Sequence, residues 1–283
     1  MKRAAVLVPA PDFVEEWDWA YDVEADALRR GGFEVEARPW TEPGDLSGFD
    51  VVLPLVVWGY HLDPPRWHAL LDRLEREAAV TLNPIPLLRW NSDKRYLAEL
   101  SRVGVSTVPM RLVEAIDEAA LNAARAEFGD MLVIKPPVSA AADGTHRLAA
   151  ADPLPEEARG KAMLVQPYLA TVASEGEYSI MLFGGTFSHA IVKRPKAGDY
   201  RVQPHLGGRE EKCVAPEGAV DLAKAALAAA PVEAAYARVD LVRLPDGRLA
   251  VMELELIEPS LWLQHAPDQG ASFAAAIAQR AQQ

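Results

Sequence analysis

Two acidic residues lie two positions apart inside an apolar run near the end of the chain. Glu253 and Glu255 belong to the segment 251–259, in which Leu254 and Leu256 alternate with them. A β-strand places alternate side chains on opposite faces, so the glutamates would share one face and the leucines the other. Ionised carboxylates side by side repel each other unless a cation such as Mg²⁺ lies between them. The alternative is a solvated polar face on an amphipathic strand.

A second strand, predicted just before this one, carries a matching charged pair. It spans residues 236–244, and the turn residues 245–248 join it to the acidic segment as a β-hairpin. Arg238 and Asp240 share one face of this strand, and antiparallel pairing brings Asp240 opposite the two glutamates. The sequence therefore predicts a metal site of three carboxylates, with Arg238 beside it to offset charge on a phosphoryl group during transfer.

Two lysines follow capping or strand-end signals rather than lying on open helical faces. Lys94 comes after residues 91–93, which favour the start of a helix continuing to Leu100, and Lys135 ends a strand predicted for 131–134. Compact ammonium groups suit the phosphates of a nucleotide. The small residues 138–145 are typical of a phosphate-covering flap, although they lack the glycine repeats of a P-loop. Acids for magnesium, lysines for phosphate and a flap together indicate ATP chemistry.

Positive charge also gathers at residues 193–196, at the end of a strand predicted for 186–192. In an acidic chain this cluster is a candidate anion site, and the alternative is an ordinary solvated surface patch. Gly184 and Gly185 predict the hairpin turn that joins this strand to the preceding one. Further helices are predicted at 116–128, 220–230 and 270–283, and a further strand at 163–169.

The first 90 residues alternate between strands and helices, which favours a small parallel sheet covered by helices. Strands are predicted at 4–8, 33–37 and 49–57, and helices at 21–30 and 65–77. Parallel sheets of this kind bind ligands beyond the carboxyl ends of their strands. Trp58, Tyr60 and His61 follow the third strand and would line a small-molecule pocket there, with plain aromatic packing as the alternative.

Composition limits the remaining possibilities. The 283 residues carry a formal net charge of −12, which argues against binding to nucleic acid or anionic membranes. The single cysteine, Cys213, cannot form an intramolecular disulfide. No apolar stretch is long enough for a membrane span, and prolines interrupt the apolar amino end too early for a secretory signal. The sequence predicts a cytoplasmic protein.

From residue 82 to residue 276 the order of motifs resembles the ATP-grasp superfamily, which includes glutathione synthetase, D-alanine–D-alanine ligase and ribosomal-protein glutamate ligases. No single motif is specific, whereas the seven in this order are. The motifs are Asp93-Lys94, Val133-Ile134-Lys135-Pro136, the flap 139–145, Val165-Gln166-Pro167-Tyr168-Leu169, Gly176-Glu177-Tyr178-Ser179, Arg238-Val239-Asp240 and Glu253-Leu254-Glu255.

Nearly the whole chain further resembles the subgroup that contains the D-cycloserine-forming ATP-grasp enzyme. The resemblance rests on residues 83–84, 90–97, 182–190, 192–195 and 253–259. In that subgroup the segment at Trp58 usually reads Trp-Asp-Tyr-His, so Gly59 stands in place of an acid. Losing an acid at this side of the cleft would change which amine or carboxylate is recognised, while ATP use would be unaffected.

The resemblance implies a role for each candidate residue. The adenine would lie against Gln166, Tyr168 and Leu169, the ribose hydroxyls against Glu177, and the phosphates against Lys94 and Lys135. The complete nucleotide set is Lys94, Lys135, Ser139, Gly144, Thr145, Gln166, Tyr168, Leu169, Glu177 and Lys193. Asp240, Glu253 and Glu255 would bind two Mg²⁺ ions, for which Mn²⁺ can substitute. Arg201 and Arg238 would stabilise charge during transfer, and the substrate would contact Trp58, Tyr60, His61 and Glu258.

The expected architecture is α/β, with α+β character in the carboxyl-terminal part. It comprises a Rossmann-like pre-ATP-grasp domain at 1–90, a central ATP-grasp subdomain with the phosphate flap at 91–168, and a metal-binding subdomain at 169–283. The expected activity is an ATP- and Mg²⁺-dependent ligase that activates a small amino-acid-like or peptide carboxylate, joins it to an amine and releases ADP and phosphate. The alternatives are intramolecular cyclisation of an amino-acid derivative and a catalytically silent nucleotide-binding regulator. Relatives suggest a homodimer.

Overall fold

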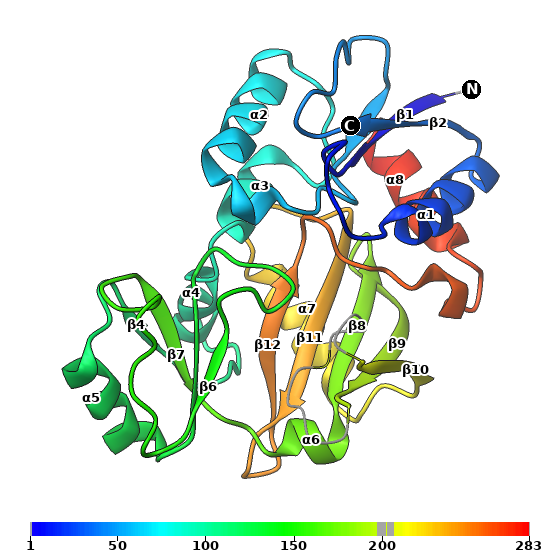
Figure 1. Cartoon of the computed structure of the whole chain (residues 1–283). Coiled ribbons are helices and arrows are strands. Elements are labelled where there is room, and N and C mark those ends of the chain that lie inside the picture. Colours follow the sequence, from blue (N-terminus) through cyan, green and yellow to red (C-terminus); the bar gives the residue numbers. More distant parts are fainter. Residues whose placement is uncertain (1, 197–201, 203–206, 283) are drawn as a thin grey trace.

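The computed structural model describes residues 2–196, 202 and 207–282, and its strands form three sheets (Figure 1). The first sheet has the order β2-β1-β3, and all its strands are parallel. Its strands are β1 (Lys2–Val8), β2 (Phe33–Pro39) and β3 (Val51–Leu53). The parallel sheet expected in the first 90 residues is therefore confirmed. β3 is shorter than predicted and is followed by Pro54, which has no N–H to donate to a strand.

Helices cover both faces of this sheet, which explains why β1 is almost wholly apolar. Ala4, Val6 and Val8 pack in one buried cluster with α1 and α8, whereas Ala5 and Leu7 pack in another with α2 and α3. The helices are α1 (Asp18–Arg30), α2 (Pro64–Arg76), α3 (Ile85–Asn91) and α8 (Ala271–Arg280). The closing helix of the chain thus returns to the amino-terminal sheet (Figure 1).

The second sheet carries the flap. It is antiparallel with the order β4-β7-β5-β6, and α5 (Glu118–Phe128) packs on it. Its strands are β4 (Arg111–Val113), β5 (Leu132–Lys135), β6 (His146–Leu148) and β7 (Met163–Pro167). The flap residues connect β5 to β6, so Lys135 lies at the base of the flap as predicted.

The third sheet carries the predicted acids and is also antiparallel, with the order β10-β9-β8-β11-β12. Its strands are β8 (Glu177–Phe183), β9 (Thr186–Arg194), β10 (Arg209–Cys213), β11 (Tyr236–Arg243) and β12 (Leu249–Glu255). Both predicted hairpins are confirmed: Gly184-Gly185 joins β8 to β9, and residues 244–248 join β11 to β12. The helices α4 (Tyr96–Arg102) and α7 (Ala219–Ala228) share a buried cluster with this sheet, and α6 (Thr171–Glu175) precedes it.

One helix prediction was wrong. Residues 91–93 were expected to cap a helix running through Lys94, but Asn91 is the last residue of α3, and α4 begins only at Tyr96. The Asn91 side chain bonds to the backbone of β12 instead, a partner that is distant in sequence. The domain limits at 90 and 168 stay predictions. In the described part of the chain, no helix is long and apolar enough to cross a membrane.

Asn83 connects the junction after the first sheet to β11 and β12. Its side chain is fully buried, and Nδ2 donates to the backbone oxygens of Tyr236 at 2.9 Å and Leu256 at 2.8 Å. Its Oδ1 accepts from the backbone N–H of Ala235 at 2.6 Å. One amide therefore satisfies buried backbone groups of two separate segments of the third sheet region.

We expect Asn83→Ala to lower the free energy of unfolding by about 3 kcal/mol or more, because each buried backbone group left unpaired costs about 1–3 kcal/mol. Urea denaturation followed by circular dichroism measures the change. Asn122→Ala, on the exposed side of α5, is the matched control and should change stability by less than about 0.5 kcal/mol. Equal effects of the two substitutions would contradict the bridging role.

Candidate active site

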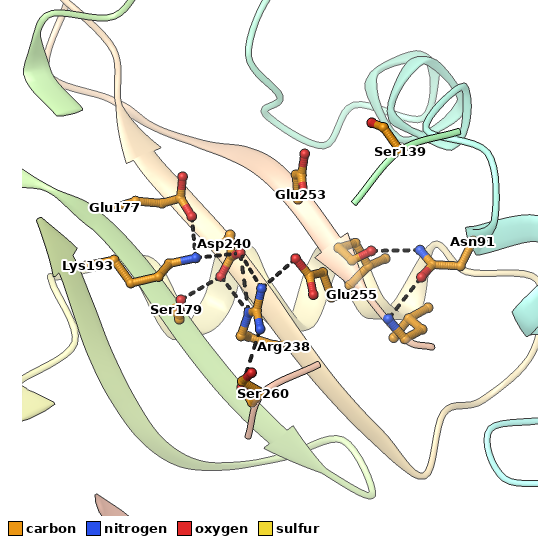
Figure 2. A network of polar contacts seen from close by, with 12 residues as sticks. Asn91, Ser139, Glu177, Ser179, Lys193, Arg238, Asp240, Glu253, Glu255 and Ser260 are labelled. Carbon is orange, nitrogen blue, oxygen red and sulfur yellow. Dashed lines mark hydrogen bonds and ion pairs between the residues drawn. The ribbon is translucent and has the colours of Figure 1, made fainter. Parts of the chain in front are cut away.

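The hairpin of β11 and β12 brings the predicted acids and arginine together. Antiparallel pairing places Asp240 opposite Glu253, as predicted, whereas Glu255 lies opposite Arg238 instead of Asp240. The Arg238 guanidinium donates to Asp240 at 3.1 Å and lies 2.5 Å from a carboxylate oxygen of Glu255 (Figure 2). A single buried arginine therefore neutralises acids from both strands.

Lys193 of β9 completes this cluster from the other side of Asp240. Its Nζ lies 2.8 Å from Asp240 Oδ2 and 2.5 Å from Glu177 Oε1 (Figure 2). The Ser179 hydroxyl also donates to Asp240, at 2.6 Å. Asp240 is only 2% exposed, and burial of its charge is tolerated because cations and a hydroxyl surround it.

Glu253 gathers the two lysines that were predicted to hold phosphates. Lys135 Nζ donates to Glu253 Oε1 at 2.9 Å, and Lys94 Nζ lies 4.0 Å from the same oxygen. The Lys94 ammonium also donates to the backbone oxygen of Ser139, at the start of the flap. Lys135 of the second sheet and Lys94 of the connection between α3 and α4 therefore meet at one carboxylate of the third sheet, and Lys94 links that carboxylate to the flap.

Burial and neighbouring charges lower the pKa of some of these acids and raise that of others. Burial would raise the pKa of Asp240, but Arg238 and Lys193 outweigh it and hold the pKa well below its usual range. Burial acts likewise on Glu253, where the nearby lysines nevertheless lower the pKa to about 2. In contrast, burial dominates at Glu177 and raises its pKa to about 7. Asp240 and Glu253 are therefore anionic at neutral pH, while Glu177 titrates there.

The pKa of Glu255 is raised, as is that of Glu177. Burial, together with the charges of Asp240 and Glu253, raises the pKa of Glu255 even though Arg238 lies against it. One guanidinium is shared between two acids, so it cannot compensate both fully. This local excess of negative charge makes the Glu255 side of the cluster the more favourable place for an added cation.

The predicted adenine residues lie at the end of β7. Gln166 is 2% exposed and Leu169 is 5% exposed. The backbone N–H of Tyr168 donates to Met131 at 2.9 Å, which ties this segment to the residue before β5. Gln166 Nε2 is buried without a hydrogen-bond partner among the described residues. An unpaired buried donor calls for an explanation, and a ligand acceptor at this position supplies one.

The flap consists of tight turns between β5 and β6. Gly144 has a φ of 64°, and a Cβ added there would lie 2.8 Å from Pro136 Cγ, so both backbone conformation and space require glycine. Ala141 and Ala142 also adopt left-handed conformations, with φ of 52° and 64°. The Thr145 backbone N–H donates to the Ala142 oxygen at 3.1 Å. Left-handed alanines are strained, so this short flap is a constrained one.

The predicted substrate residues have different environments. Tyr60 is 6% exposed and packs on Trp67 with ring centroids 5.3 Å apart, which matches the packing interpretation of its ring. Trp58 is half-buried. His61 Nε2 lies 4.0 Å from Asp143 of the flap, and its buried Nδ1 has no partner within the described residues. His61 therefore brings the loop after β3 next to the flap.

Glu258 lies just beyond β12 and differs from the predicted metal ligands Asp240 and Glu253. Burial and the charge of Glu255 raise the pKa of Glu258 to about 8. Its side chain is therefore mainly a neutral carboxylic acid at pH 7 and can donate a hydrogen bond. The other predicted catalytic arginine, Arg201, lies outside the described residues.

Several polar residues that the sequence did not single out hold β12 in place. Asn91 donates to the Leu254 oxygen at 2.6 Å and accepts from the Leu256 N–H at 2.9 Å, on either side of Glu255. Tyr96 Oη donates to the same Leu254 oxygen at 3.0 Å and accepts from its N–H at 2.8 Å. A polar side chain at a buried helical position was the available signal, but it did not identify the partner strand.

The predicted metal ligands each face a cation in this structure. Within the described residues, no three His, Cys, Asp or Glu side chains are grouped closely enough to hold a metal ion. The chemistry of the donors nevertheless fits a magnesium–nucleotide complex, because carboxylate oxygens are hard ligands and the adjacent ammonium and guanidinium groups suit phosphate. The assignment of Asp240, Glu253 and Glu255 to metal binding stays a prediction.

The antiparallel sheet that carries the flap and the antiparallel sheet that carries the acid-rich hairpin contribute side chains to one site, and comparisons with known proteins identify the family. A family model described as the D-cycloserine synthetase DcsG N-terminal domain matches residues 6–83. The chain is 32% identical over 277 residues to the cycloserine biosynthesis protein DcsG of Streptomyces lavendulae, covering 90% of this chain and 91% of that protein. It therefore belongs to the ATP-grasp ligase family that contains DcsG.

Other relatives support the same fold. The chain is 30% identical over 200 residues to glutathione synthetase of Prochlorococcus marinus (strain MIT 9313), covering 66% of this chain and 62% of that protein. The crystal structure of D-cycloserine synthetase DcsG has a TM-score of 0.85 at 30% identity and covers 99% of both chains. D-alanine–D-alanine ligase from Bacillus anthracis has a TM-score of 0.72 at 18% identity, with 100% and 98% coverage. The expected α/β ATP-grasp fold and the subgroup are confirmed.

The raised pKa of Glu258 predicts that the stability of the protein depends on pH. Its pKa rises from 4.5 to about 8 on folding, so the stabilisation from its proton is fully present below pH 4.5 and is lost as the pH rises through 8. Between pH 6 and pH 9 we expect a loss of about 2–3 kcal/mol, or roughly 4 °C in Tm. Differential scanning calorimetry across this range measures the loss.

Glu258→Gln replaces the neutral acid with a neutral amide and should remove this loss, while the smaller loss from Glu177, whose pKa is raised to about 7, should persist. Glu217→Gln, which changes an exposed glutamate, should follow the wild-type profile. Parallel profiles for all three proteins would show that the Glu258 carboxyl does not carry a raised pKa.

Proposed function

We propose that this chain is an ATP- and Mg²⁺-dependent ligase that activates a small amino-acid-like or peptide carboxylate and joins it to an amine, releasing ADP and phosphate. The observation that carries this proposal is the alternation of cations and acids at one buried site. The cations are Lys94, Lys135, Lys193 and Arg238, and the acids are Glu177, Asp240, Glu253 and Glu255. Buried ion pairs add little to stability by themselves, so function is the better reason for them.

When a nucleotide binds, these cations can exchange their carboxylate partners for phosphate groups. Lys94 and Lys135 would move from Glu253 to the phosphates, because a polyphosphate offers more negative charge than one carboxylate. The same movement would free Glu253, Asp240 and Glu255 to hold two magnesium ions. Bound magnesium would neutralise phosphate charge, and the protein residues would position the reacting groups. A solved structure of similar fold supports this use of ATP, since D-alanine–D-alanine ligase from Bacillus anthracis was crystallised in complex with ATP.

We assign the rest of the nucleotide to residues beside this cluster. The adenine lies against Gln166, Tyr168 and Leu169, where the unpaired Gln166 amide donates to the base. Glu177 binds the ribose hydroxyls, and Lys193 supports the phosphates. Ser139, Gly144 and Thr145 cover the phosphates from the flap. The predicted divisions 1–90, 91–168 and 169–283 would then contribute the substrate side, the nucleotide cover and the metal ligands.

Arg238 is our choice for the charge that develops when the substrate carboxylate is phosphorylated, and Arg201 is assigned the same task. A guanidinium already held by acids of both strands is preorganised for this role. The amine would then attack the acyl phosphate, and phosphate would leave. We assign the substrate itself to Trp58, Tyr60, His61 and Glu258, which lie on the side of the cluster toward the first sheet.

Intramolecular ring closure is the second candidate. It is favoured by the 32% identity to the cycloserine biosynthesis protein DcsG over most of the chain. Ligation and cyclisation share the nucleotide chemistry and differ in the acceptor. A requirement for two substrates supports ligation, and turnover of one substrate to a dehydrated product supports cyclisation. A silent regulator would have no use for the complete set of acids beside Arg238.

MgATP should raise the Tm, because a ligand that binds only the folded state at 100 times its Kd adds about 2.7 kcal/mol. We expect Lys135→Ala to reduce this shift by more than half, since the residue supplies a phosphate contact at the base of the flap. Differential scanning fluorimetry with and without MgATP measures both. Lys161→Ala removes an exposed lysine and should keep the full shift. No shift for the wild type at millimolar MgATP would exclude the nucleotide site.

Release of ADP in the presence of L- and D-amino acids and dipeptides tests catalysis directly. Glu253→Gln should lower the rate by about 100-fold or more while part of the MgATP thermal shift survives, because the amide cannot neutralise magnesium. Glu217→Gln serves as the surface control. Coupled measurement of ADP, with mass spectrometry of products, separates ligation from cyclisation. An unchanged rate in Glu253→Gln would remove this residue from the metal site, and a blank screen would favour the regulator.

A further inference from the structure

A tryptophan beyond the acidic strand lies over two of the cations. Trp262 is 5% exposed, and the centroid of its ring is 5.1 Å from Arg238 Cζ and 5.9 Å from Lys193 Nζ. Both cations also contact Asp240 Oδ2, Lys193 at 2.8 Å and Arg238 at 3.1 Å. The indole therefore faces the two groups that neutralise Asp240, an acid that is only 2% exposed.

The backbone at Trp262 is unusual for a bulky residue. Its φ is 43° and its ψ is 47°, in the left-handed region that tryptophan rarely adopts. Residues immediately before it are held from the third sheet: Arg238 Nη1 lies 3.4 Å from the Ser260 oxygen, to which it donates, and His189 Nε2 lies 3.0 Å from the Leu261 oxygen. Arg238 thus bonds to the loop that carries the ring over it. Strained conformations persist where the surroundings fix them, often at functional sites.

The ring face, rather than the indole N–H, makes these contacts. Trp262 Nε1 is buried and has no hydrogen-bond partner among the described residues. An aromatic face attracts cations without adding an acceptor that would compete for their N–H groups. Another carboxylate at this position would instead reduce the positive charge available to a phosphoryl group.

We propose that Trp262 is a positioning residue whose ring face fixes Arg238 and Lys193 for phosphoryl transfer. The inference rests on the proposed function, in which Arg238 stabilises developing charge and Lys193 supports the phosphates. The ring is nearer to Arg238 than to Lys193, so its loss affects the chemical step more than nucleotide affinity. The aromatic ring, and not the volume of the side chain, is the feature that matters.

Trp262→Leu and Trp262→Phe separate these two features, because leucine fills space without a π face and phenylalanine keeps the face without the N–H. We expect Trp262→Leu to lower kcat for ADP release roughly tenfold, with a smaller change in KM for ATP. Trp262→Phe should restore kcat to within about threefold of the wild type. Phe273→Leu is the control, since Phe273 is a buried aromatic that packs on Phe183 away from the cations. It should lower Tm and leave kcat unchanged.

A measurement without substrate keeps the positioning claim separate from the proposed activity. In protein labelled with 5-fluorotryptophan, the ¹⁹F resonance missing from Trp262→Phe belongs to Trp262. Lys193→Met should shift that resonance, whereas the resonance of Trp90, which donates to Glu99 outside the cluster, should not move. This result supports the contact even if the wild type releases no ADP, which would count against the ligase proposal alone. The inference would be overturned by an unmoved Trp262 resonance, by an equal loss of kcat in Trp262→Phe and Trp262→Leu, or by an unchanged kcat in Trp262→Leu.

Discussion

Compensation of the buried Asp240 carboxylate is the constraint on which the third sheet depends. Removing such a charge from water is costly, and an uncompensated one would destabilise the fold by several kcal/mol. Ser179 of β8, Lys193 of β9 and Arg238 of β11 all contact it, so three adjacent strands must keep one register. Arg238 extends the same constraint to Glu255 on β12. The register of the third sheet and the balance of charge around Asp240 therefore depend on each other.

The segment that follows the first sheet is tied to the third sheet through polar side chains. Asn83, Asn91 and Tyr96 bond to backbone groups of β11, β12 and the residues beside them, and Tyr236 Oη donates to the Ile257 oxygen at 3.0 Å. These bonds fix the strand end that presents Glu255 and leads to Glu258. These bonds consequently fix the position of the acidic strand end relative to the first sheet, as the proposed phosphoryl transfer would require.

The sequence predicted most of the local structure because hydrophobic period and turn chemistry act over a few residues. The alternation around Glu253, the turn at Gly247 and the parallel amino-terminal sheet were all anticipated correctly. Contacts set by distant residues were missed. Asn91 carries a helix-capping signature, yet its hydrogen-bond partners lie more than 160 positions away in the sequence. Trp262 adopts a left-handed conformation that a glycine or asparagine would have indicated, but a tryptophan does not. The pairing of Lys193 with Glu177 likewise appears only once β8 and β9 are aligned.

The loop after β3 shows how this chain departs from its subgroup within a shared fold. Gly59 has a φ of 87°, and a Cβ there would lie 3.3 Å from the Phe13 ring. The aspartate usual in the subgroup would be strained in this conformation and would press on Phe13. Gly59 and Phe13 are therefore matched to each other in this loop. An aspartate at position 59 would require both a different backbone conformation and a displaced Phe13 ring, so the shape of this loop and its lack of an acid at this position depend on each other.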